Sequence, residues 1–438
     1  MSDIAPELPG HFNEIDPGLI DSQNALFAYG QVRSATERFS AALSAEDQNL
    51  QSMPDTSPVK WHRAHTSWFF ETFLLKPFLP GYRGFDDSYT YLFNSYYNGV
   101  GAQYPRPSRG LISRPDMAEI GRYRACIDES MAALLQHAES ASQRDQIMAL
   151  VVLGLNHEQQ HQELMATDIK HALSYNPACP AIVPEPENDR SGTSLNWIEV
   201  AGGLIRIGSD NPAFCFDNER PRHRVFLNNF KLASRPVSCG DFLAFIDDQG
   251  YRRPELWLSD GWAWVRQNDI QAPLYWLQED GEWLLYTLGG KRALDPAETA
   301  CHLNFYEACA YAQWAGARLP TEAEWEHAST LACADGPNAD SGRFHPDVPA
   351  AAAAGRLSQM FGGVWEWTQS SYAPYPGFQP AAGAVGEYNG KFMANQMVLR
   401  GGSCATPGGH VRPSYRNFFY PPDRWQFTGV RLARDGEQ

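Results

Sequence analysis

Apolar residues in the first 175 positions recur at helical spacing, in four segments separated by polar or proline-containing stretches. This pattern predicts helices at about 16–43, 57–77, 115–138 and 142–173. Ser57 and Pro58 should begin the second helix as its N-cap and first helical residue, and Asn176-Pro177 should end the fourth. Four such helices predict a bundle, whose core commonly holds metal sites.

A long connection joins the second and third predicted helices. Residues 81–114 are rich in tyrosine, glycine, proline and arginine. Connections of this length inside a compact domain are usually functional. We therefore expect part of the site in this loop.

The pattern changes after residue 176. Residues 177–196 have the composition of a linker, with several prolines followed by a polar run. Beyond them, short apolar stretches alternate with Gly, Pro and Asn clusters, and few helices are expected. The clearest are at about 306–315 and 321–328, the latter opened by a capping box of Thr321 and Glu324. The chain is thus predicted to be an α+β protein of two domains, at 1–176 and 197–438.

Composition narrows the class of partner. The chain is 43% apolar and 13% aromatic, as globular proteins are. No apolar run approaches the ~18 residues that span a bilayer, and the start lacks signal-peptide features, so we expect a cytoplasmic protein without a membrane partner. A formal charge of −16 without a basic run argues against nucleic acid. The eight cysteines form no C-x-x-C pair and should be free thiols, most of them buried.

Two histidines in the fourth predicted helix are candidate metal ligands. His157 and His161, in H-E-Q-Q-H, are four residues apart and share one helical face. They continue a stripe at core spacing with Ile147, Leu150, Gly154, Leu164 and Asp168. Burying imidazoles is unfavourable unless they are hydrogen-bonded or ligate a metal, so the stripe favours a metal site.

A third ligand should come from the second helix, which offers His62 and His65. His65 lies at helical spacing from Trp68 and Phe69, which gives it a modest preference over His62. Three neutral histidines leave open positions on an octahedral iron for two substrates and dioxygen. The same ligands would suit a catalytic zinc, and H-E-x-x-H is also the zincin signature, with Glu158 as general base.

At this point the chain resembles a known family. The segment W-H-R-A-H-T-S-W-F-F-E-T-F around His65, together with H-E-Q-Q-H at 157–161, resembles the iron site of the ergothioneine sulfoxide synthases. The second half resembles the formylglycine-generating-enzyme domain that these synthases carry. The residues that carry this second resemblance are Gly202-Gly203 to Gly208-Ser209, R-L-P-T-E-A-E-W-E at 318–326, G-V-W-E-W-T at 363–368, R-G-G-S at 400–403 and G-V-R-L-A at 429–433.

The resemblance implies a DinB-like four-helix bundle followed by a C-type-lectin-like domain. It implies that Fe(2+) is held by His65, His157 and His161, which settles the choice against His62, and that much of the substrate pocket comes from the second domain. The family uses dioxygen to join the imidazole C2 of hercynine (Nα-trimethylhistidine) to the sulfur of cysteine or γ-glutamylcysteine, giving a sulfoxide.

Further site residues follow from the resemblance. Gln160 matches a glutamine that hydrogen-bonds the substrate imidazole. Tyr96 and Tyr97 match a tyrosine pair beside the iron, where a phenol can supply a proton. Arg106 resembles an arginine that binds the carboxylate of the donor. The segment Tyr415-Arg416-Asn417-Phe418-Phe419 matches the pocket segment that approaches hercynine in the family.

Two departures bear on activity. Cys404 has no second cysteine close by, so formylglycine-generating activity, which needs a copper-binding pair, is not expected. The stretch after Asn417 also differs from the cysteine-binding pattern, and it offers Arg424 and Trp425 as donor contacts. A selenosugar donor, as in the sister group of selenoneine synthases, is therefore the alternative. A zinc-dependent thiol transferase and a lectin-like binding module are further alternatives.

Overall fold

The chain forms two compact units that do not coincide with two continuous stretches of sequence. The computed structural model describes residues 22–136, 141–185 and 191–436. Unit 1 consists of Met1–Ile169 together with two short segments from later in the chain, Asn211–Cys215 and Ala382–Tyr388. Unit 2 contains the remaining residues.

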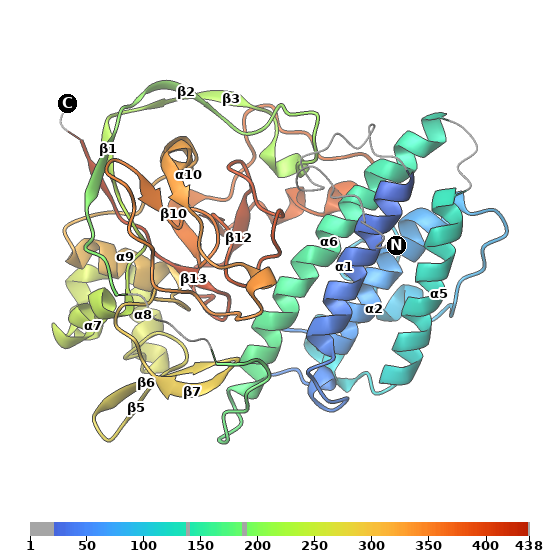
Figure 1. Ribbon diagram of the computed structural model, residues 1–438, viewed down its shortest axis with the longest axis horizontal. Helices are drawn as coiled ribbons and strands as arrows, with labels where there is room; N and C mark the ends of the chain where they lie inside the picture. Colours follow the sequence, from blue (N-terminus) through green and yellow to red (C-terminus); the bar gives the residue numbers. More distant parts are fainter. Residues whose placement is uncertain (1–21, 137–140, 186–190, 437–438) are drawn as a thin grey trace, which may run out of the picture. The chain divides into compact units, whose positions relative to one another are not determined.

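Unit 1 is built on four long helices (Figure 1). They are α1 (Ser22–Ser40), α2 (Val59–Phe70), α5 (Met117–Gln136) and α6 (Ala141–Leu173). These helices confirm the four that the periodicity predicts, although residues 16–21 of the first and 137–138 of the third lie outside the described part. The α5 helix packs against both α1 and α2. From residue 151 onward, α6 is buried around nearly its whole circumference, with even Glu158 and Lys170 fully covered.

The start and end of α2 differ from expectation. The prediction that Ser57 caps this helix is wrong, because Pro58 is the N-cap residue and makes no side-chain capping bond. The Ser57 hydroxyl instead accepts a hydrogen bond from Arg109. At its other end, α2 runs into a π-helical turn, Glu71–Leu75, followed by the short α3 (Lys76–Phe78). Such turns often occur near functional sites.

The long loop after α3 is ordered against α2. It contains α4 (Tyr89–Leu92) and a 3-10 helix, Arg106–Leu111. The indole N–H of Trp61 donates to the carbonyl of Leu92 at 3.0 Å. Lys60 likewise donates to the carbonyl of Ile112. These bonds fix the loop beside the face of α2 that carries the histidines.

Unit 2 combines small sheets with four helices. One sheet has the order β12 (Asn417–Phe419), β11 (Met397–Arg400), β10 (Trp365–Ser371), β13 (Thr428–Gly429), and another the order β1 (Trp197–Val200), β4 (Phe230–Ala233), β14 (Ala433–Asp435). Three smaller sheets are formed by β2 (Gly203–Ile207) with β3 (His223–Leu227), by β5 (Trp276–Glu279), β6 (Glu282–Thr287) and β7 (Gly290–Ala293), and by β8 (Ala332–Ala334) with β9 (Leu357–Ser358). The helices are α7 (Cys239–Asp247), α8 (Ser259–Asn268), α9 (Phe305–Trp314) and α10 (Glu322–Ala328).

Capping explains where three of these helices begin. The predicted box at Thr321 and Glu324 is present at the start of α10. The same reciprocal arrangement starts α7 at Ser238 and Asp241. The periodicity does not predict α7 and α8, although the Ser238 box is a local signal for α7.

Several of the quoted motifs of the second half meet in the core of unit 2. The Glu366 carboxylate accepts hydrogen bonds from the indole of Trp325 and from the guanidinium of Arg431, and all three side chains are fully buried. A second buried pair joins Arg400 to Glu322 at 2.9 Å. The motifs thus supply buried hydrogen bonds and ion pairs that join β10 and β11 to α10.

Two composition-based expectations can be compared with the structure. Among the described residues, no helix is long and apolar enough to cross a membrane. All eight cysteines are free thiols, as expected, but only Cys239, Cys301 and Cys404 are buried, so the expectation that most are buried is wrong.

Candidate metal centre

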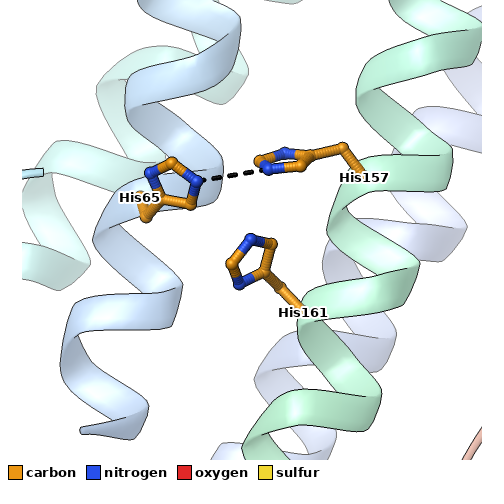
Figure 2. A group of neighbouring side chains, drawn as sticks. All are labelled: His65, His157 and His161. Carbon is orange, nitrogen blue, oxygen red and sulfur yellow. Dashed lines mark hydrogen bonds between the residues drawn. The ribbon is translucent and has the colours of Figure 1, made fainter. Parts of the chain in front are cut away.

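Three histidines converge inside unit 1. His65 comes from α2, and His157 and His161 come from successive turns of α6 (Figure 2). One ring nitrogen from each lies within 4.8 Å of the other two, and the described residues contain no other group of this kind. His65 and His157 are almost fully buried, and His161 is 8% exposed. Three converging imidazole nitrogens can bind a divalent metal and leave a coordination position open.

The orientation of His65 is set by its surroundings. Its Nδ1 lies 2.6 Å from the carbonyl oxygen of Phe93, to which it can only donate. Its Nε2 therefore carries the lone pair, and it faces Nε2 of His157 at 3.2 Å. The indoles of Trp61 and Trp68 stack on the same ring, with centroids 4.6 and 5.4 Å away. The ring is thus held with its free nitrogen toward the other two histidines.

His62 lies beside the centre but is not part of the converging group. Its Nδ1 is 2.8 Å from Nδ1 of His161, and its Nε2 is 3.1 Å from Oδ2 of Asp168. His62 and Asp168 are both buried. The geometry thus separates the two candidates in α2: His65 faces the centre and His62 contacts the far nitrogen of His161.

Burial keeps these histidines in the form that binds metals. It lowers the pKa of His65 and His161 well below the ordinary value, and their histidine neighbours lower it further. Burial also lowers the pKa of His157 to about 3, although Glu158 acts in the opposite direction. Neutral imidazoles with available lone pairs are the result.

Glu158 faces a cationic cluster on another side of α6. Its two oxygens lie 3.0 Å from Arg33 and 3.0 Å from Arg124, and the Thr36 hydroxyl donates to it at 2.7 Å. Burial opposes ionisation, but the two arginines outweigh it and lower the pKa of Glu158 to about 2. A zincin general base must be available to a metal-bound water. These contacts therefore argue against the peptidase alternative.

Three tyrosines gather next to the histidines. The rings of Tyr96 and Tyr97 are 4.8 Å apart, and Tyr388 lies 5.8 Å from Tyr96 and 5.9 Å from His157, centroid to centroid. Burial raises the pKa of both Tyr96 and Tyr97, so their phenols stay protonated. Tyr388 thus contacts a histidine of the centre, and the predicted pair packs against Tyr388 through Tyr96.

No local sequence signal points to Tyr388, because it reaches unit 1 through the late segment Ala382–Tyr388. Its neighbour Glu387 fixes that segment to the loop after α4. The carboxylate of Glu387 accepts the backbone N–H groups of Asn98 and Gly99 at 3.0 and 2.8 Å. Residues almost 300 positions apart are joined here.

Arg109 is a second residue that the resemblance does not supply. Its guanidinium lies 3.4 Å from the centroid of the Trp61 ring and donates to Ser57 at 2.9 Å. It is 4% exposed, it forms no ion pair with any described residue, and its Nε has no partner among them. Arg106, three residues earlier, is exposed. Burial and the charge of Arg106 lower the pKa of Arg109 well below its usual value.

The remaining predicted residues lie mostly in unit 2. Asn417, Phe418 and Phe419 form β12, and Phe418 stacks on Tyr372 at 4.0 Å. Trp425 approaches Phe419 edge-on at 6.4 Å. Arg424 donates to the carbonyl of Ala272 and lies over the ring of Trp264. In unit 1, Gln160 is half-buried on α6, one residue before His161. Their roles toward substrates stay predictions.

Similarity to known proteins identifies the second half first. Residues 183–348 and 342–436 match the family described as the sulfatase-modifying factor enzyme 1-like domain. The chain therefore belongs to the class of proteins that combine this domain with a helical unit, and here the helical unit carries the three histidines. The expected formylglycine-generating-enzyme resemblance is confirmed.

Similarity over the whole chain then identifies the family. The chain is 32% identical to a hercynine oxygenase of Mycolicibacterium smegmatis over 92% of its own length and 97% of that protein. It is 33% identical to a hercynine oxygenase of Mycobacterium tuberculosis, over 87% and 92% of the two chains. An ergothioneine biosynthesis protein of Schizosaccharomyces pombe is 27% identical over 51% of this chain and 28% of that protein. The chain belongs to the hercynine oxygenase family, as the resemblance predicted.

Proposed function

We propose that this protein is an iron(II)- and dioxygen-dependent sulfoxide synthase. It would bond the imidazole C2 of hercynine to the sulfur of cysteine or γ-glutamylcysteine. The observation that carries the proposal is the convergence of His65, His157 and His161 in a buried site. Family membership supports the acceptor, since two hercynine oxygenases match nearly the whole chain.

The three histidines fit a ferrous ion. Each can present a neutral nitrogen, and the 3.2 Å between Nε2 of His65 and Nε2 of His157 matches two ligands of one ion. His65, His157 and His161 would hold the ion, each through one ring nitrogen. When bound, iron would supply the coordination sites and electrons that dioxygen chemistry requires. The protein would hold the substrates, exclude water and deliver protons.

Arg109 is the residue best suited to hold the carboxylate of an amino-acid donor. A buried guanidinium without a counter-ion is costly, and a bound carboxylate would relieve that cost through charge-assisted hydrogen bonds. Its fixed position over Trp61 leaves its Nε without a hydrogen-bond partner among the described residues. Arg106, three residues earlier and exposed, would add long-range attraction for the same anion.

The tyrosine cluster would serve as the proton source. Burial raises the pKa of Tyr96 and Tyr97, so both phenols stay protonated. The ring of Tyr388 contacts both Tyr96 and His157. A phenol at this place can give a proton to a developing oxygen anion. The role would favour carbon–sulfur bond formation over oxidation of the thiol alone. Gln160 and the Asn417–Phe419 segment are proposed to contact hercynine.

Aerobic incubation of iron-loaded protein with hercynine and a donor tests the proposal. Mass spectrometry should detect the sulfoxide with cysteine or γ-glutamylcysteine, and omission of iron or dioxygen should abolish it. If product forms with a selenosugar and with neither thiol, the protein is a selenoneine synthase and not a sulfoxide synthase. Full turnover with zinc and without dioxygen would contradict it and favour a thiol transferase.

A further inference from the structure

The contact between His62 and His161 links the centre to a buried carboxylate. Asp168 Oδ2 accepts the backbone N–H of Ser57 at 2.8 Å and lies 3.1 Å from Nε2 of His62. Nδ1 of His62 then lies 2.8 Å from Nδ1 of His161. All of these side chains are buried, so water does not compete for the bonds. The result is a three-membered chain, Asp168–His62–His161.

The Asp168 carboxylate determines which nitrogen of each histidine carries the proton. An ionised carboxylate can only accept, so Nε2 of His62 must carry the proton that it donates to Asp168. Nδ1 of a neutral His62 then has the lone pair and can only accept. Nδ1 of His161 must therefore carry a proton, and its Nε2 must carry the lone pair.

That distribution selects the nitrogen of His161 that can bind a metal. A histidine ligand needs its lone pair on the nitrogen that faces the ion, and a hydrogen bond from the other nitrogen fixes this tautomer. His65 achieves the same result through Phe93, whose carbonyl also only accepts. The tautomers of two of the three candidate ligands, His65 and His161, are thus fixed by acceptors within the protein.

We infer that His62 and Asp168 are positioning residues that hold His161 in the Nδ1–H tautomer and aim its Nε2 at the metal. His62 would therefore act through His161, without being a ligand itself. The inference rests on the proposed metal centre and deepens it, because it assigns a role to the second histidine of W-H-R-A-H.

Cobalt(II) is a suitable probe, because it binds imidazole sites and shifts the N–H signals of its ligands in proton NMR. Replacing His62 by Phe keeps a ring but removes the acceptor, whereas Asn keeps an acceptor near the position of Nδ1. The Phe variant should bind cobalt about 10- to 100-fold more weakly, as loss of such partners typically causes. The Asn variant should stay near the wild type. The shifted N–H signal of His161 should disappear in the Phe variant while that of His65 remains.

A measurement on the unaltered protein keeps the inference testable if the Phe variant does not fold. In metal-free wild type labelled with 15N-histidine, His161 should be the Nδ1–H tautomer. The Nε2–H tautomer there would overturn the inference, as would a folded Phe variant with wild-type affinity and all N–H signals retained. Either result would leave the proposed iron site standing. Failure of the wild type to bind cobalt or iron would instead overturn the metal centre itself, and the inference with it.

Discussion

The Nε2 atoms of His65 and His157 lie 3.2 Å apart, and the Phe93 carbonyl leaves the His65 nitrogen without a proton. A neutral His157 can carry its single proton on Nε2 and donate it to His65, or carry it on Nδ1 and leave both Nε2 lone pairs free. Burial disfavours a further proton on either ring, since it lowers the pKa of both. A metal ion satisfies both nitrogens at once.

Replacing either ligand on α6 should abolish tight metal binding. We expect wild type to bind one ferrous ion, and His157→Ala or His161→Ala to bind none tightly, because two imidazoles alone leave the ion largely hydrated. Anaerobic titration followed by elemental analysis measures the stoichiometry. Ser57→Ala, which removes a hydroxyl that accepts a hydrogen bond from Arg109, is a control and should retain one ion. One ion in both histidine variants would contradict the assignment.

Removing a phenol from the tyrosine pair should change the product and not the binding. We expect Tyr96→Phe or Tyr97→Phe to bind hercynine and donor normally but to lower the rate and shift product toward oxidised donor, because a proton source acts in the transition state. Tyr388→Phe tests the third phenol in the same assay. The ratio of sulfoxide to sulfinate is the readout. Unchanged rates and ratios in all three would show that the cluster is structural.

Substitutions of Arg109 and Arg106 compare a buried and an exposed cation as the binding partner of the donor carboxylate. We expect Arg109→Met to raise the donor KM about 10- to 100-fold, which corresponds to ~1.5–3 kcal/mol for a charge-assisted bond. Arg106→Ala should have a smaller effect that weakens with added salt, because an exposed charge is screened. Hercynine KM should hardly change. A larger effect at Arg106 than at Arg109 would reverse the assignment, and no effect at either would place the carboxylate elsewhere.

Gly154 should resist substitution, because it lies one turn before His157 where α6 meets α2. A Cβ there would come within 2.6 Å of Phe70 and 3.1 Å of Phe69. Gly154→Ala should therefore destabilise the protein by ~1–3 kcal/mol, although alanine normally favours a helix. Gly121→Ala in α5 meets nothing within 4 Å and should be neutral or stabilising by up to ~1 kcal/mol. Chemical denaturation of both variants tests the contrast.

Lys170 should make stability depend on alkaline pH. Its ammonium group lies 2.7 Å from His302 Nε2 and over the ring of Tyr275, and burial lowers its pKa to about 8 from 10.5. Between these values the unfolded chain keeps a proton that the folded protein has released. Stability therefore rises with pH across this window.

A Lys170→Met variant isolates that contribution. The free energy of unfolding of wild type minus that of the variant should increase from pH 8 to pH 10.5, by up to the order of 3 kcal/mol. The variant removes the amine and keeps an apolar chain of similar length, so other alkaline titrations cancel in the difference. A difference that is flat or falls across the window would show that Lys170 stays protonated in the folded protein.

The helical unit and its ligands could be predicted because their signals are local. Heptad-like spacing locates α6, and two histidines four residues apart must share a face of it. Periodicity cannot show that α6 is buried on nearly all sides, since Glu158 and Lys170 are covered only through partners on other elements. Spacing also leaves His62 and His65 close alternatives, which the contacts of each ring separate.

Features that depend on contacts between residues distant in sequence could not be predicted, because local spacing carries no information about such contacts. The cation at Arg109 differs from that at Arg106 only in burial, which depends on the packing of a 3-10 helix against Trp61. Tyr388 reaches the centre from the far end of the chain. The register of the small sheets in unit 2 is likewise set by side chains distant in sequence, so composition there indicated only mixed structure.

The two late segments that belong to unit 1 limit how this protein can have diversified. A gene fusion at the linker would bring a bundle and a lectin-like domain together, but it would not by itself supply Glu387 and Tyr388, whose contacts lie with the loop after α4 and with His157. Exchange of the second half between relatives would replace those residues together with their scaffold. The two halves are therefore expected to be inherited as a pair, and a hybrid would need residues 211–215 and 382–388 from the parent that supplied its bundle.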